Sequence, residues 1–324
     1  MRNFKFVIIA LLATTVLSGP LAAQSEEGLP GQLVQDLHAA FGEHNARAVH
    51  AKGNILSGTF TPTTEAAGLS VADTFARTVP VIVRFSDFTG IPDISDTNPL
   101  ASPRGFAIKL DPGGPGEMDI VAHGFNGFPT TTAAEFGQLL LAIAASGPDN
   151  AKPTKLDAFL ESHPIAAAFL THQSPAPESY GTNAYFGVNA FAFTDATGAQ
   201  HFVRYRFVPQ AGEHYLDAAA SAAKDPNFLQ AEIADRVKAG PVLFDWFAQI
   251  SGPGDVIDDP SIAWPEDRDL INLGTITIGA LADQKEMDAS LIFIPSNVPD
   301  GVAPADPMID IRSSAYPISY GERQ

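Results

Sequence analysis

Short runs rich in β-branched and aromatic residues, bounded by turn signals, constrain the fold of this 324-residue chain more than any other feature. These strand-like runs lie at 79–85, 105–110, 118–121, 184–194, 200–208, 272–279 and 289–294. Turn chemistry separates neighbouring runs, as in the Asp-Pro-Gly-Gly stretch at 111–114 and the Asp-Ala-Thr-Gly stretch at 195–198. The sequence therefore predicts a sheet of many short strands.

Helical segments interrupt and flank these strands. The sequence predicts helices at 24–46, 133–147, 153–171 and 226–251, and a last one at the C-terminus. The last helix is expected to begin at Asp306, because Asp is a good N-cap and Pro307 suits the first turn. Pro317 is expected to end it at Tyr316.

Strands that cluster before and after helical insertions indicate an α+β fold with an antiparallel β-barrel at its centre. The hydrophobic fraction of 45% is enough for a sizeable core, which excludes disorder as the main state. No loop marks a domain boundary, so residues 24–324 are expected to form one domain.

The composition excludes several classes of function. The chain contains no cysteine, which removes disulfide scaffolds, Cys–zinc sites, iron–sulfur clusters and thiol nucleophiles. It carries 37 acidic and 19 basic side chains, a formal net charge of −18. Phosphate contacts need a basic surface, so nucleic acid is not an expected partner.

The first 23 residues are a different kind of sequence. Arg2 and Lys5 precede an apolar run from Phe6 to about Ser18, and small residues follow as far as Ala23. This is the pattern of a cleaved secretory signal, and the run is too short to span a bilayer comfortably. We expect a periplasmic or otherwise exported protein with no membrane span after cleavage. A buried N-terminal helix is the alternative.

The C-terminal helix carries the first specific chemistry. Arg312 and Tyr316 are four residues apart, so they share one face of a helix. A guanidinium beside a phenol stabilises the phenolate, the form in which tyrosine binds ferric iron. An Arg stacked on a surface Tyr would give the same spacing, so the residues alone leave both interpretations open.

Two more features lie among the strands of the N-terminal half. His50 sits between small and β-forming residues, and a lone His of this kind is more often a hydrogen-bonded core or surface residue than a ligand. Arg84 and Ser86 are two apart in an apolar strand and therefore share a face. A buried Arg at this point needs an anionic partner, which a ligand carboxylate or an Asp side chain would supply.

Taken together, these segments resemble the haem-dependent catalases and, among them, the small catalase-related peroxidases. The similar stretches are the distal-His segment at 47–53, the Val-Arg-Phe-Ser strand at 81–86, the Arg-Gly-Phe-Ala strand at 103–109, the Pro-Ser-Asn turn at 295–301 and the Arg-x-x-x-Tyr-Pro motif at 312–317. They occur in the family's order, and the resemblance runs from about 47 to 323.

The resemblance implies a haem b cofactor bound between two polar groups. Tyr316 would be the phenolate ligand of the iron, and Arg312 would keep it ionised. His50 would be the distal acid–base group that moves a proton between the two peroxide oxygens. Ser86 would hydrogen-bond the far nitrogen of His50 and fix its tautomer.

The same resemblance implies further residues around the cofactor. Arg47 and Arg84 would pair with the haem propionates, and Arg323, seven residues after Tyr316, is a third candidate. Val49 would narrow the distal channel. Phe136 lies where the family packs an aromatic ring over the haem.

One stretch departs from the pattern of large catalases, in which an Asp-Leu-Val-Gly run leads to a distal Asn that helps to bind peroxide. Here the run at 119–122 is followed by His123, and Asn126 comes three residues later in a Phe-Asn-Gly-Phe-Pro stretch. That stretch is similar to the small catalase-related peroxidases. We take Asn126 as the distal candidate, with His123 or neither residue as the alternatives.

The mature chain also leaves no room for the long N-terminal arm or the added helical domain of larger catalases. The resemblance therefore implies a peroxidase that reduces hydrogen peroxide or organic peroxides with small organic donors, with weak catalase activity, as a monomer or homodimer. The alternatives are a true catalase, an exported haem-binding protein without turnover, a haem isomerase that rearranges lipid hydroperoxides, and a ligand-binding barrel without haem.

Overall fold

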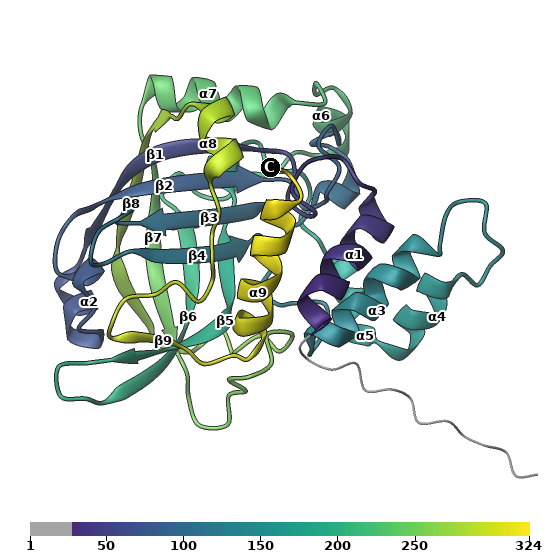
Figure 1. The fold of residues 1–324 in the computed structure, drawn as a ribbon. Helices are drawn as coiled ribbons and strands as arrows, with labels where there is room; N and C mark the ends of the chain where they lie inside the picture. Colours follow the sequence, from purple (N-terminus) through teal and green to yellow (C-terminus); the bar gives the residue numbers. More distant parts are fainter. Residues whose placement is uncertain (1–27) are drawn as a thin grey trace, which may run out of the picture.

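A closed antiparallel β-barrel forms the centre of the computed structural model, which describes residues 28–324 (Figure 1). Its strands are β1 (Gly53–Pro62), β2 (Val79–Ser86), β3 (Gly105–Leu110), β4 (Met118–His123), β5 (Tyr185–Thr194), β6 (Gln200–Pro209), β7 (Val242–Ile250) and β8 (Leu270–Leu281). They pair in the order β4-β3-β2-β1-β8-β7-β6-β5, and a bridge between His123 and Phe186 closes the ring. A short strand β9 (Val302–Pro304) adds to β5. The predicted α+β fold with an antiparallel barrel is confirmed.

Helices lie outside the barrel. They are α1 (Leu29–Phe41), α2 (Thr64–Leu69), α3 (Ala133–Ala144), α4 (Lys155–Ser162), α5 (Pro164–Thr171), α6 (Ala218–Ala222), α7 (Phe228–Ala239), α8 (Gln284–Ser290) and α9 (Met308–Gly321). Figure 1 shows α9 beside the wall of β3 and β4, with α1 next to it, and α1 packs between α9 and α3. Within residues 28–324, no helix combines the length and the apolar character needed to cross a membrane.

The side chains of β2, β3 and β4 alternate between the inside and the outside of the barrel, as strand geometry requires. Phe85 and Phe106, paired across β2 and β3, point inward and stack with ring centroids 5.0 Å apart. Their neighbours of opposite parity, Arg84, Ser86 and Ala107, point outward. One wall of the barrel thus serves both the core and the cavity described below.

One predicted helix is wrong in its second half. The sequence predicts a helix over 226–251, but α7 ends at Ala239 and residues Val242–Ile250 form β7. Gly240 and Pro241 interrupt the helix, since Pro disfavours helix in the residue before it. From Val242 onward every second residue is buried, which is the period of a strand.

Three further differences concern the ends of elements. The strand predicted at 289–294 is wrong, because Asp283 caps α8 through the amides of Lys285 and Glu286, α8 runs to Ser290, and residues 291–294 have no regular structure. The helix predicted at 153–171 is divided into α4 and α5 before Pro164.

The last helix runs through Pro317 to Gly321, so the predicted end at Tyr316 is also wrong. Proline removes only one hydrogen bond, to the carbonyl four residues earlier. Tertiary contacts hold the extra turn: Ser319 Oγ accepts from the amide of Ala48 at 3.1 Å, and α9 packs against α1. The Asp306 carboxylate accepts from the amide of Met308 at 2.9 Å, as a capping residue does.

Residues 1–27 lie outside the described part of the chain. The export signal expected at 1–23 and the domain boundary at 24 therefore stay predictions. The monomeric or dimeric state is also still a prediction.

We expect Phe60→Ala to lower the free energy of unfolding by about 3–5 kcal/mol, because it leaves a cavity in the barrel core. Phe60 is fully buried, with its ring centroid 5.1 Å from that of Trp246 and 6.3 Å from that of Phe75. Val208→Ala, at a side chain 41% exposed, is the control and should cost less than about 1 kcal/mol. Equal denaturant midpoints for the two variants would contradict the packing described here.

Candidate active site

A cavity lies between the outer face of β2–β4 and the helices α1 and α9, and it encloses about 820 Å³ of empty space including its open mouth. Its walls are largely apolar and include Val34, Leu37, Ala48, Val49, Ala107, Val121, Ala122, Leu291, Ile292, Phe293 and Ala315. Polar side chains enter at a few points only, namely Tyr316 and Tyr320, the pair of His50 and Ser86, Ser319, and the arginines Arg47, Arg84 and Arg323.

Tyr316 and Arg312 form the polar group on the α9 side. Arg312 donates to the phenol oxygen of Tyr316 from Nε at 3.0 Å and from Nη2 at 2.7 Å. Its remaining Nη1 donates to Asn189 Oδ1, and Asn189 Nδ2 donates to Asp306 Oδ2 at 2.7 Å. The guanidinium is therefore fixed from β5 and aimed at the oxygen. An oxygen that accepts twice from one guanidinium suits a charged, metal-binding phenolate better than a surface stack.

The two residues behind Arg312 were not predicted as parts of the site. Asn189 lies in the run at 184–194, which was predicted only as a strand, and Asp306 was predicted as a helix cap, which it also is. Neither role has a local sequence signal, since both depend on where β5 meets the start of α9.

His50 faces the cavity from the segment before β1. Its backbone is left-handed, with φ of 56°, and Arg84 holds it there by donating to the carbonyls of His50 at 2.8 Å and Ala51 at 2.9 Å. The Nδ1 atom of His50 lies 3.0 Å from Ser86 Oγ, which leaves Nε2 for a ligand. A Cβ at Gly105 would lie 2.7 Å from that Nδ1 atom, so only glycine leaves room for the ring.

The imidazole of His50 is kept neutral by its surroundings. Burial, and next the positive charge of Arg84, lower the pKa of His50 to about 3. A neutral imidazole whose Nδ1 is bonded to a hydroxyl can accept a proton at Nε2 near neutral pH.

Buried charges support this segment from behind. Lys52 forms an ion pair with Asp96 and donates to two backbone carbonyls, at 2.7 and 2.9 Å. Arg104 is paired with Asp87, which also accepts from the hydroxyl of Tyr180 at 2.9 Å. These side chains are almost fully buried, so the network fixes the chain on both sides of His50 and Ser86.

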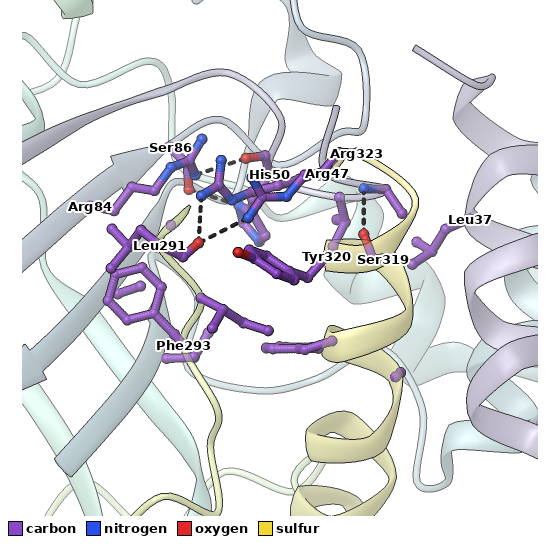
Figure 2. Close-up of a pocket in the computed structure, with 18 of the residues that line it drawn as sticks. Leu37, Arg47, His50, Arg84, Ser86, Leu291, Phe293, Ser319, Tyr320 and Arg323 are labelled. Carbon is purple, nitrogen blue, oxygen red and sulfur yellow. Dashed lines mark hydrogen bonds between the residues drawn. The ribbon is translucent and has the colours of Figure 1, made fainter. Parts of the chain in front are cut away.

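Three arginines, Arg47, Arg84 and Arg323, gather at one end of the cavity (Figure 2). Arg47 and Arg323 donate to the Leu291 carbonyl at 3.1 and 2.9 Å. Arg47 also donates to the carboxylate of Asp288 on α8. Arg84 Nε lies 3.5 Å from this carboxylate and has no hydrogen-bond partner among the described residues.

A buried Arg84 was expected to need an anionic partner, either a ligand carboxylate or an Asp side chain, and Asp288 is such an Asp. Burial raises the pKa of its carboxyl, but the charges of Arg47 and Arg84 outweigh burial and lower that pKa below its usual value. The cluster still holds three guanidinium groups and only one carboxylate.

The remaining predicted residues, Val49, Phe136 and Asn126, differ in whether they lie at the cavity. Val49 lines the cavity, and Phe136 packs on its apolar rim with its ring 5.0 Å from that of Phe128. Asn126 is not brought to the distal group, since its amide donates to Glu266 Oε1 at 3.2 Å, away from the cavity. The reason is its position in the loop after β4, whereas His123 is still part of the strand.

The cavity fits a haem. Its apolar walls suit a flat ring, and the phenol of Tyr316 and the imidazole of His50 both enter it. The excess of guanidinium groups suits the carboxylates at one edge of such a group. Arg84 Nε, for example, faces Asp288 at 3.5 Å without a hydrogen bond among the described residues.

Known proteins match this chain over nearly its whole length. The family model described as Catalase matches residues 34–323. A catalase-related peroxidase of Mycolicibacterium paratuberculosis is 36% identical over 297 residues, which cover 90% of this chain and 93% of that protein. A catalase-related peroxidase of Synechococcus elongatus is 33% identical over 333 residues, which cover 99% of this chain and 97% of that protein.

The fold has a solved counterpart. Catalase A from Saccharomyces cerevisiae superimposes with a TM-score of 0.74 at 19% identity, covering 99% of this chain and 68% of that one. The expected likeness to the small catalase-related peroxidases is confirmed by the two relatives. The chain belongs to the catalase family, haem-dependent oxidoreductases that act on peroxide.

Proposed function

We propose that the protein is a peroxidase that reduces hydrogen peroxide or organic peroxides with small organic electron donors and has weak catalase activity. The observation that carries this proposal is the entry of two polar groups into one apolar cavity, Tyr316 with Arg312 and His50 with Ser86. The names of the two relatives support a peroxidase. A protein that only carried haem would have no need of the pair formed by His50 and Ser86.

The cofactor of this proposal is a haem b. Tyr316 would bind its iron, with Arg312 holding the phenol oxygen, and Arg47, Arg84 and Arg323 would hold its propionates. When bound, the haem supplies the redox chemistry that cleaves peroxide and takes up electrons from the donor.

The protein's own groups handle the proton. With haem supplying the two electrons that cleave the O–O bond, His50 Nε2 would accept the proton of one peroxide oxygen and return it to the other. That oxygen would leave as water from hydrogen peroxide, or as an alcohol from an organic peroxide. Ser86 holds Nδ1 during both transfers, so the ring keeps its orientation and its tautomer. The apolar walls, including Val49 and Val121, exclude bulk water from these transfers.

Purified, haem-loaded protein should oxidise a small phenolic donor faster than it releases oxygen from hydrogen peroxide. The measurement is donor absorbance against oxygen evolution in the same sample. Oxygen release as the faster reaction would favour a true catalase. Silence in both assays, with haem bound, would favour a haem carrier.

Tyr316→Phe should weaken haem binding at least about 100-fold, since it removes the phenol oxygen that Arg312 holds. The measurement is an absorbance titration of the haem-free protein with haem. Tyr320→Phe is the matched control, because Tyr320 lies on the same helix and lines the same cavity. Equal haem affinity in the two variants would refute the ligand assignment.

His50→Asn should retain haem and lower the rate of reaction with peroxide by about 10²–10⁴-fold, because an amide cannot accept the proton. Asn tolerates the left-handed backbone of this position, so the fold should persist.

In the wild type the rate of reaction with peroxide should be constant between pH 5 and 8, since a pKa of about 3 keeps His50 neutral throughout.

The control for His50→Asn is His214→Gln, at an exposed histidine that should leave the rate unchanged. A His50→Asn protein that reacts with peroxide at the wild-type rate rules out His50 as the proton acceptor.

A further inference from the structure

Three tyrosines lie in the core of the barrel, and the reaction with peroxide described above uses none of them. Tyr180, Tyr185 and Tyr205 are each at most 1% exposed. A buried phenol usually finds a hydrogen-bond partner, and these three differ in the partner that they find. Their hydroxyls therefore differ in the chemistry that is open to them.

Tyr180 is the one of the three whose hydroxyl is bonded to an ionisable group. It donates to the carboxylate of Asp87 at 2.9 Å. The hydroxyl of Tyr185 donates to the backbone carbonyl of Tyr180 at 2.9 Å, and the hydroxyl of Tyr205 has no partner within residues 28–324. A carboxylate can take up a proton and a backbone carbonyl cannot, so Tyr180 has a base within reach and the other two phenols do not.

The carboxylate of Asp87 has capacity for a proton. Its Oδ1 atom accepts from both Tyr180 and Arg104, whereas its Oδ2 atom is buried and has no hydrogen-bond partner within the described residues. Burial raises the pKa of Asp87, and the charge of Arg104 opposes this rise only in part. Burial also raises the pKa of Tyr180 well above its usual value, so the phenol keeps its proton until an electron is removed.

Tyr180 lies close behind the wall of the cavity. Its ring stacks on that of Phe85, with centroids 5.4 Å apart and an angle of 4° between the planes. Phe85 stands between Arg84 and Ser86 in β2, and both of these neighbours line the cavity. Asp87 follows Ser86 directly in the chain. One strand therefore separates Tyr180 and its base from the cavity, and an electron can cross that thickness without direct contact between the two sides.

Removal of one electron from a phenol makes its O–H group strongly acidic. A base that is hydrogen-bonded to the hydroxyl takes the proton as the electron leaves, and the product is a neutral phenoxyl radical. A phenol without a base must keep the positive charge on its ring, which is costly in an apolar core. Tyr180 is therefore easier to oxidise than Tyr185 or Tyr205.

We propose that Tyr180 is a second redox site, which supplies one electron to the oxidised cofactor when no organic donor is at hand. This inference rests on the proposed function, in which peroxide oxidises the cofactor by two electrons. The O–H bond of Tyr180 breaks, its electron passes to the cofactor, and its proton forms a new O–H bond on Asp87. When an organic donor later gives up one electron and releases its own proton to solvent, Tyr180 is reduced and takes its proton back from Asp87.

The test is electron paramagnetic resonance of haem-loaded protein, frozen after mixing with hydrogen peroxide in the absence of a donor. We expect the signal of a tyrosyl radical in the wild type, its narrowing in protein made with ring-deuterated tyrosine, and its loss in Tyr180→Phe. Tyr185→Phe is the matched control, because it removes an equally buried hydroxyl with a partner at the same distance, and it should keep the signal. A phenolic donor added after the peroxide should remove the signal.

The partner of the radical can be measured without a further substitution. A phenoxyl oxygen that accepts a hydrogen bond from protonated Asp87 has a lower gx value in the high-field spectrum than one without a hydrogen bond. The gx value of a free phenoxyl radical would reject Asp87 as the proton acceptor. Tyr180→Phe and Tyr185→Phe each remove one buried hydrogen bond, so their denaturant midpoints should be similar, and a signal lost only in Tyr180→Phe would not come from unfolding.

A tyrosyl signal that persists in Tyr180→Phe would overturn the inference, and its loss in Tyr320→Phe instead would place the radical at the cavity. The absence of a tyrosyl signal in wild-type protein whose haem absorbance changes with peroxide would also overturn it, and would leave the proposed function intact. No change in haem absorbance with peroxide would reject the proposed function and this inference together.

Discussion

The alternation of side chains along β2, β3 and β4 is the constraint on which the rest of the structure depends. Phe85 and Phe106 fill the barrel, while their neighbours Arg84 and Ser86 build the cavity on the other side of the same wall. A slip of one residue would exchange the two sets and place a guanidinium in the aromatic core. The packing of the barrel therefore also fixes where Arg84 and Ser86 lie, because the inward-facing and the outward-facing side chains follow from the same strand register.

Arg84 connects the two ends of the cavity. Two of its nitrogens hold the backbone carbonyls of His50 and Ala51, and the third faces Asp288 in the arginine cluster. Three guanidinium groups against one carboxylate leave two positive charges, the number that the two propionates of a haem b would balance. Asp288 limits the mutual repulsion of the arginines, of which Arg84 is buried.

Short motifs made much of the site predictable, and long-range contacts account for the rest. The spacing of Arg312 and Tyr316 needs only one helix, and the structure brings them together as predicted. Asn189 and Asp288 carry no signal, because each acquires its role from an element distant in the chain. The sequence analysis missed β7 because it took the apolar run after α7 as a continuation of that helix. The residues after Gly240 nevertheless have the period of two that indicates a strand.

The choice between His123 and Asn126 shows what such periodicity can decide. Asn126 was favoured for its residue type, since an amide was expected in the distal role. The strand that contains Val121 reaches His123 and ends there, so only His123 has the parity of the cavity face. Residue type alone favoured the amide, whereas strand parity assigns His123, and not Asn126, to the outer face of the barrel wall.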